Sequence, residues 1–161
     1  MKSTILAGAL ALGLLAQAPH AAAQTPAGCA QALTDACLSQ LLTGLGYEPK
    51  PLSKGFLIAK KQDTWTMYMQ LVISGNGEKI GINANLGAVD DTAVSAAQWQ
   101  ALLVANGNID PSAFYYDADQ KKLYLHRSLD NRAVTPASLG GQIDNFMDNI
   151  RSTAKLWNFT H

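Results

Sequence analysis

Apolar and polar residues alternate in two neighbouring stretches of the chain, residues 64–74 and 78–87. A period of two residues is that of a β-strand with one buried face. The residues expected on the buried face are Trp65, Met67, Met69, Leu71 and Ile73 in the first stretch and Ile80, Ile82, Ala84 and Leu86 in the second. The turn sequence Gly75-Asn76-Gly77 joins the two. With a further strand predicted over residues 55–61 (GFLIAKK), they form an antiparallel meander.

Two helices are predicted on either side of this meander, because apolar residues recur there at intervals of three and four. The first begins after a cap at Thr34 and ends at Gly46. The second follows a capping box of Ser95 and Gln98 and ends at Asn106-Gly107. Their apolar stripes consist of Leu38, Leu41, Leu42 and Leu45 in the first helix and Trp99, Leu102 and Leu103 in the second.

The last third of the chain predicts two strands and a long helix. The strands cover residues 112–117 (SAFYYD) and 121–129 (KKLYLHRSL). The helix starts at the cap and first-turn proline Thr135-Pro136 and is expected to continue to near Asn158. Its apolar positions are Leu139, Ile143, Phe146, Met147, Ile150, Ala154 and Trp157. The predicted order of elements is therefore α-β-β-β-α-β-β-α, with no repeat or linker that would divide it.

Asp117 and Asp119 have the spacing of two ligands in a calcium-binding loop, but a hairpin turn is the preferred interpretation. They lie between two predicted strands, in the short polar sequence DADQKK. A calcium loop needs further oxygen ligands at fixed spacing and a glycine for its sharp turn. Lys121 and Lys122 occupy the following positions and would repel a cation. Asp in a turn instead accepts hydrogen bonds from its own backbone.

The first 23 residues have the pattern of a secretory signal peptide. Lys2 precedes an apolar run over residues 5–15, and small residues lead to Ala23. The run is too short to span a bilayer, which takes about 20 residues. Cys29 is not placed as a lipidation signal, because it lies well beyond the apolar run. We therefore expect cleavage after Ala23, a single domain over residues 24–161, no membrane insertion after cleavage, and a periplasmic or secreted product.

Export favours a disulfide between Cys29 and Cys37, the only two cysteines of the chain. On one continuous helix they would stand about 12 Å apart at 1.5 Å per residue. That distance exceeds the limit of roughly 7 Å between the Cα atoms of a disulfide. A bridge therefore requires Cys29 to lie in a non-helical segment that folds back onto the helix, which Pro26 and Gly28 allow. Two separate thiols remain the alternative.

Composition and motifs point away from several function classes. Lys and Arg number 12, Asp and Glu also 12, and no segment is strongly basic, which argues against nucleic-acid binding. Neither a G-x-S-x-G nor an H-E-x-x-H motif occurs, and no phosphate-binding loop or pair of catalytic glutamates. We therefore expect no catalytic residues, no metal and no cofactor.

Three segments resemble the YbjN family of proposed bacterial sensory transduction regulators. They are residues 41–49 (LLTGLGYEP), 99–109 (WQALLVANGNI) and 113–150, from AFYYDADQKK to NFMDNI. The resemblance extends from about Leu38 to Trp157. It implies the fold of the type III secretion chaperones, an α+β two-layer sandwich in which helices cover an antiparallel sheet of about five strands. Chaperones of this fold pair as dimers and bind extended segments of partner proteins.

The resemblance suggests an exported, non-enzymatic protein-binding or regulatory module with an unknown protein partner and a possible homodimer. The expected partner-binding residues are aromatic and aliphatic side chains on the non-core face of the sheet, Tyr68, Val72, Tyr124 and His126. Alternatively, a helix covers this face. A second hypothesis is an envelope enzyme or inhibitor with a small pocket around His126, Arg127 and Asp130. A third is a stress-related envelope protein with a transient partner.

Overall fold

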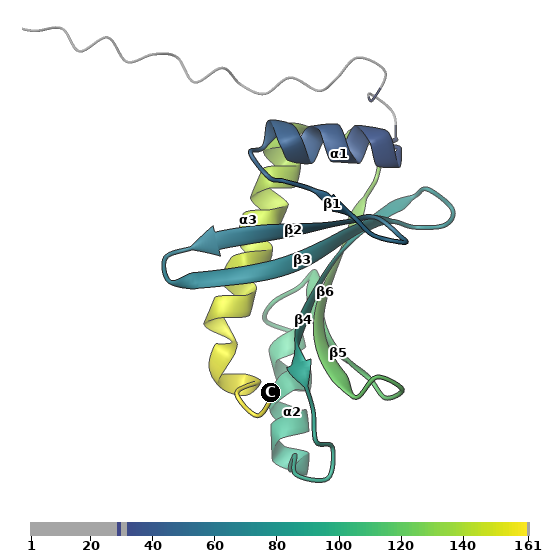
Figure 1. Cartoon of the computed structure of the whole chain (residues 1–161). Helices are drawn as coiled ribbons and strands as arrows, with labels where there is room; N and C mark the ends of the chain where they lie inside the picture. The colour runs from purple at the N-terminus through teal and green to yellow at the C-terminus, as the bar shows by residue number, and fades with distance from the viewer. Residues whose placement is uncertain (1–28, 30–31, 161) are drawn as a thin grey trace, which may run out of the picture.

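The computed structural model describes residue 29 and residues 32–160, so the predicted signal peptide lies outside the described residues. Its centre is a six-stranded antiparallel sheet in the order β1-β2-β3-β4-β6-β5 (Figure 1). The strands are β1 (Lys50–Pro51), β2 (Phe56–Gln62), β3 (Trp65–Ile73), β4 (Lys79–Ala88), β5 (Ser112–Asp117) and β6 (Lys122–Asp130). The sheet has six strands where about five were predicted. The additional strand β1 is two residues long and ends in proline, so no alternation could reveal it.

Three helices accompany the sheet: α1 (Asp35–Gly44), α2 (Ala96–Asn106) and α3 (Pro136–Ser152). The predicted caps are confirmed, since the side chains of Thr34, Ser95 and Thr135 each accept a backbone hydrogen bond from the first turn. In the described part of the chain, none of the helices combines the length and apolar character needed to cross a membrane. The observed order is α-β-β-β-β-α-β-β-α, an α+β fold.

The last helix is shorter than predicted. It ends at Ser152, and a short 3-10 helix, η1 (Ala154–Leu156), follows it. Trp157 has the spacing of a helical core residue, but it lies in the tail beyond η1. Its ring packs edge to face against Trp65 at the start of β3, with centroids 6.2 Å apart. The spacing therefore correctly indicated that Trp157 packs against the core, where it is partly buried, but wrongly placed it in the helix.

The core lies on one face of the sheet, between the sheet and α1 and α3. The inward positions predicted from the alternation are confirmed in the middle of β3 and β4, where Met69, Leu71, Ile80 and Ile82 are fully buried. The helices supply Leu38, Leu42, Leu139, Ile143, Phe146, Met147 and Ile150, all fully buried as well. Packing of this kind on one side leaves the other side of each strand facing outward.

The sheet opens along its middle. Only four residue pairs connect β3 with β4, from Gln70 opposite Asn83 to Ile73 opposite Ile80. Beyond Gln70 and Asn83, β3 continues beside β2, and β4 continues beside β6. Figure 1 shows the result: the β2–β3 hairpin and the β4–β6–β5 part diverge at a steep angle. An angle is therefore left between the two halves of the sheet.

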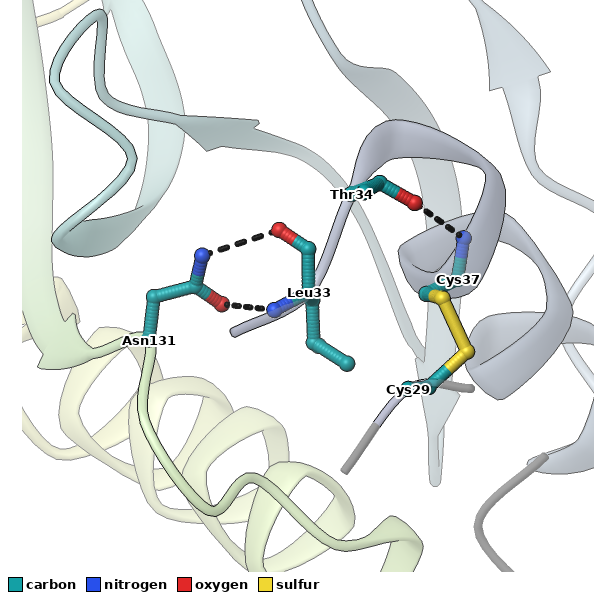
Figure 2. The surroundings of a disulfide bond; sticks show 5 residues. All are labelled: Cys29, Leu33, Thr34, Cys37 and Asn131. Atoms are coloured by element: carbon teal, nitrogen blue, oxygen red, sulfur yellow. Dashed lines mark hydrogen bonds between the residues drawn. A yellow bond between two sulfur atoms is a disulfide. The ribbon is translucent and has the colours of Figure 1, made fainter. Parts of the chain in front are cut away.

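The segment before α1 is fixed at two points (Figure 2). Cys29 forms a disulfide with Cys37 in the first turn of α1, with their Cα atoms 5.8 Å apart. Cys29 lies outside the helix, which is the arrangement that the spacing required. Asn131, after β6, donates to the Leu33 carbonyl at 2.9 Å and accepts from the Leu33 N–H at 3.0 Å. The disulfide therefore joins Cys29 to α1, and the amide pair holds Leu33 against Asn131.

Candidate binding face of the sheet

The side of the sheet opposite the core, called the outer face below, contains all four residues proposed for partner binding. Tyr68 and Val72 lie on β3, and Tyr124 and His126 lie on β6. They alternate with buried residues in both strands, which places them on the side away from the core. Towards the middle of β3 to β6, this face also contains Gln70, Gly81, Asn83, Asn85, Ala113, Tyr115 and Ser128, and charged residues lie at the strand ends, at Lys79, Asp117, Lys122 and Asp130.

No helix covers the recessed part of this face. Tyr68 is 60% exposed and Tyr115 is 44% exposed. Two recesses on this face are lined by strand residues and Leu52, and no residue of α1, α2 or α3 takes part in them. The alternative that a helix packs over these side chains is therefore wrong for the described residues.

Two adjoining recesses run across the strands, and we call them together the transverse groove. The first, of about 360 Å³, lies in the angle between the halves of the sheet and is lined by Leu52, Leu57, Met67, Tyr68, Gln70, Asn83, Asn85 and Tyr124. Met67 faces the core side, and it reaches this recess where the ladder between β3 and β4 has ended. The second, of about 460 Å³, is lined by Asn83, Ala113, Tyr115 and His126. Neither lining contains an Asp, Glu, Lys or Arg.

Aromatic rings form one wall of the groove. Tyr115 of β5 stacks on Tyr124 of β6, with centroids 5.1 Å apart and ring planes 9° from parallel. The edge of Tyr115 also meets His126 at 6.4 Å. Sequence reasoning overlooked Tyr115, although a signal was present. Because Phe114 and Tyr116 were expected in the core, alternation places the residue between them on the opposite face.

His126 lies in the floor of the groove and is held by two neighbours. Its Nδ1 is 2.8 Å from Asn83 Oδ1. Its ring also lies close to Gly81, where an added Cβ would stand 3.3 Å from His126 Cε1. Glycine at position 81 therefore leaves room for the imidazole against the sheet. Partial burial lowers the pKa of His126 below its usual value, so the ring is neutral at pH 7.

The proposed pocket around His126, Arg127 and Asp130 is not formed. Neighbouring residues of a strand point to opposite faces, so Arg127 lies on the core side, only 4% exposed. Its Nε donates to Ser112 Oγ at 3.0 Å and its Nη1 donates to Gln142 Oε1 at 2.8 Å. Asp130 pairs with Arg132, whose guanidinium holds the pKa of that carboxyl far below its usual range. The three side chains do not converge on a common site.

The hairpin interpretation of Asp117 and Asp119 is confirmed. Asp117 Oδ1 accepts from the backbone N–H groups of Asp119 and Gln120, at 3.1 and 2.9 Å, so it closes the turn between β5 and β6. Across residue 29 and residues 32–160, no three His, Cys, Asp or Glu side chains are grouped so as to hold a metal ion. The two aspartates therefore belong to the turn.

The fold matches solved structures of the kind that the sequence resemblance predicted. YbjN of E. coli, described as a proposed transcription regulator, superposes with a TM-score of 0.57 at 17% sequence identity, over 73% of this chain and 86% of that one. The HopA1–SchA chaperone–effector complex gives 0.53 at 13% identity, over 71% and 88%. The ExsC–ExsE complex gives 0.55 at 15% identity, over 76% and 92%. The chain thus has a YbjN-like, secretion-chaperone-like fold.

Sequence comparison adds nothing to this result. No family model matches the chain, and no curated protein matches it. At such low identity the structural likeness establishes the fold.

Proposed function

We propose that the protein is an exported, non-enzymatic protein-binding module that holds a segment of its partner in the transverse groove. The observation that carries this proposal is the open outer face, on which Tyr68, Tyr115 and Tyr124 line two adjoining recesses whose linings contain no charged residue. Tyrosine is enriched at protein interfaces, because it buries a large apolar ring and keeps a polar end. Solved structures with this fold include a chaperone–effector complex, which supports a protein as the partner.

Capture of partners from periplasmic extract tests the groove. Tyr68→Asp and Tyr124→Asp each place a charge in the uncharged recess, so both should lose the partners that the wild-type protein retains. Asn108→Asp is the matched control, because Asn108 is exposed in the turn after α2 and lies outside the groove lining. Equal recovery by all four proteins would refute binding at this face.

Export is the second part of the proposal, and it rests on the sequence of residues 1–23. The intact mass of the protein recovered from the periplasm or medium should correspond to a chain that begins at Gln24. A product that retains residues 5–15, or one with a lipid on Cys29, would contradict the assignment.

Homodimerisation through α2 completes the proposal. Leu103 and Val104 project from this helix with 71% and 64% of their surface exposed. Next to them lies a mainly apolar recess of about 180 Å³ between α2 and the sheet edge, lined by Trp99, Phe114 and Tyr116 among others. Light scattering after gel filtration should give the mass of a dimer, and Leu103→Glu should give a monomer. A monomeric wild-type protein would exclude this interface.

A further inference from the structure

The space between the start of β3 and the end of β4, called the split below, exposes a strand edge inside the sheet. Successive residues of a strand direct their backbone N–H and C=O groups to opposite neighbours. The Ser74 N–H donates to the Lys79 carbonyl where β3 turns into β4, so the even-numbered residues of β3 face β4. Thr66 and Tyr68 are among them, but they have no residue opposite, because the ladder with β4 ends at Gln70. Their N–H and C=O groups therefore face the split without a strand partner.

The opposite wall of the split is not a regular edge. The bulge of β4 lies here, and Asn85 Oδ1 accepts from the Gly87 N–H across it at 3.0 Å. The Leu86 carbonyl accepts from Thr160 Oγ1 of the C-terminal tail at 2.8 Å. The regular row of backbone groups in the split therefore belongs to β3, and a segment that enters the split pairs with β3.

The spacing of these groups selects an extended polypeptide. Thr66 and Tyr68 each offer one donor and one acceptor, and the two sets lie two residues apart, about 7 Å along the strand. A β-strand repeats its own N–H and C=O groups at the same interval. A polyproline II segment repeats every three residues, and an α-helix bonds these groups internally. The backbone of β3 thus specifies the conformation of its ligand, whatever the side chains of the groove donate or accept.

The two edges of the β2–β3 hairpin differ in protection. On the outer edge, Lys50 and Pro51 of β1 cover the start of β2, and Lys61 lies exposed further along. Lysine and proline are residues with which proteins protect sheet edges against other strands. On the inner edge, Thr66 and Tyr68 are exposed and uncharged, and the recess of about 360 Å³ beside them has no charged residue in its lining. The inner edge is therefore the one left open to a further strand.

We propose that an extended segment of the partner enters the split and adds a strand to β3, antiparallel to it and in line with the existing β3–β4 ladder. This inference rests on the proposed function and states how the first recess of the transverse groove holds the partner segment. The side chains opposite Thr66 and Tyr68 lie on the outer face, and the side chain between them lies against Met67, which packs on the core. Polar residues suit the outer positions, and a β-branched apolar residue suits the position between them.

The test uses the exported protein and a fluorescein-labelled, C-terminally amidated peptide, Thr-Val-Thr-Val-Thr-Val-Thr, whose binding is followed by fluorescence anisotropy. With valine on the core side, the threonine N–H groups face β3 and the valine N–H groups face away from it. A peptide that is N-methylated at its two central threonines should therefore bind at least about tenfold more weakly, equivalent to ~1.4 kcal/mol. A peptide that is N-methylated at two of its valines should bind like the unmodified peptide.

Thr66→Pro is the matching change in the protein, because it removes an N–H that faces the split and takes no part in the ladder with β2. It should weaken binding of the unmodified peptide about tenfold. Lys61→Pro is the matched control, since Lys61 lies directly opposite Thr66 in the hairpin and its N–H faces the outer edge. Lys61→Pro should leave the affinity unchanged, and so should Thr66→Ala, which keeps the backbone N–H.

Saturable binding that is lost both with the threonine-methylated peptide and with Thr66→Pro supports the inference. Absence of saturable binding, equal binding of the two N-methylated peptides, or a loss with Lys61→Pro in place of Thr66→Pro would each overturn it. The last result would place the peptide on the outer edge. Thermal unfolding of both proline variants close to that of wild type shows that a lost affinity is not a lost fold. The pair of N-methylated peptides tests the pairing on the unaltered protein, whatever the stability of the variants.

The same variants separate this inference from the proposed function. If partners are captured in a Tyr124-dependent manner and Thr66→Pro captures them equally well, the proposed function stands and strand addition in the split fails. If the peptide binds through Thr66 and no partner is captured, the proposed function fails instead.

Discussion

The side chain of Asn106 forms the two backbone hydrogen bonds of Phe114 that a neighbouring strand would otherwise form. The Phe114 N–H donates to Asn106 Oδ1 at 2.7 Å, and Asn106 Nδ2 donates to the Phe114 carbonyl at 3.3 Å. β5 is the last strand of the sheet, so these groups lie on a free edge. Free edges invite pairing with other chains. The last residue of α2 therefore blocks the middle of this edge.

Asn106→Ala should lower the free energy of unfolding by about 1–3 kcal/mol, because two backbone groups in a half-buried place lose their partner. Urea unfolding measures the change. Asn108→Ala, two residues further in the exposed turn, should stay within roughly 0.5 kcal/mol of wild type. Equal midpoints for the two variants would show that the amide contact is not stabilising.

The two aspartates in the turn between β5 and β6 should contribute differently to stability. Asp117→Ala removes the acceptor of two backbone N–H groups and should cost about 1 kcal/mol. The Asp119 side chain accepts no hydrogen bond among the described residues, so Asp119→Ala should cost only a few tenths of a kcal/mol. Calcium should leave the melting temperature of the wild-type protein and of both variants unchanged. A calcium-induced rise that Asp119→Ala abolishes would contradict the hairpin assignment.

The sequence predicted the strands, helix caps and core positions well, because each of them depends on neighbouring residues. Alternation along β3 and β4 identified the buried face, and the same rule would have found Tyr115. Alternation could not show that residues 65–69 of β3, before Gln70, lie away from β4. That divergence depends on packing between distant segments, and it creates the first recess of the groove.

The candidate site was predicted in part for the same reason. Tyr68 and Tyr124 were expected on one face, and they share it. The grouping of His126 with Arg127 was wrong, since adjacent strand positions face opposite sides. The orientation of the Asn83 and Asn85 amides could not be predicted at all. Asn83 lies against His126, which is 43 positions away in the chain, and Asn85 accepts from the Gly87 N–H across the bulge of β4.

The disulfide between Cys29 and Cys37 should stabilise the protein without being required for its fold. The loop it closes is short, so the chain-entropy model gives roughly 2–3 kcal/mol. Leu33 is also held by Asn131, and Cys29 is one member of a core whose other buried side chains come mainly from the sheet, α1 and α3. The double variant Cys29→Ser/Cys37→Ser should therefore melt lower and still unfold cooperatively. Thiol titration of the unfolded, unreduced wild-type protein should find no free thiol. Two free thiols per chain would exclude the bridge.

His126 should make stability depend on pH in the mildly acidic range. Burial disfavours the imidazolium, so the pKa of His126 in the folded protein lies below the unfolded value of about 6.5. Between these two pKa values the unfolded chain binds more protons than the folded chain. The free energy of unfolding therefore falls as the pH falls through this window, and His126 contributes no such change above it.

His126→Gln isolates this effect, because glutamine is neutral throughout and can still donate to Asn83 Oδ1. The groups around the ring are Asn83, Ala113, Tyr115 and Gly81, and none of them titrates between pH 5 and 7. Urea unfolding at pH 7 and at pH 5 should show a larger loss of stability for wild type than for the variant. The difference between the two proteins cancels the contribution of carboxylates elsewhere. Equal losses in both proteins would mean that the folded state accommodates the imidazolium without cost.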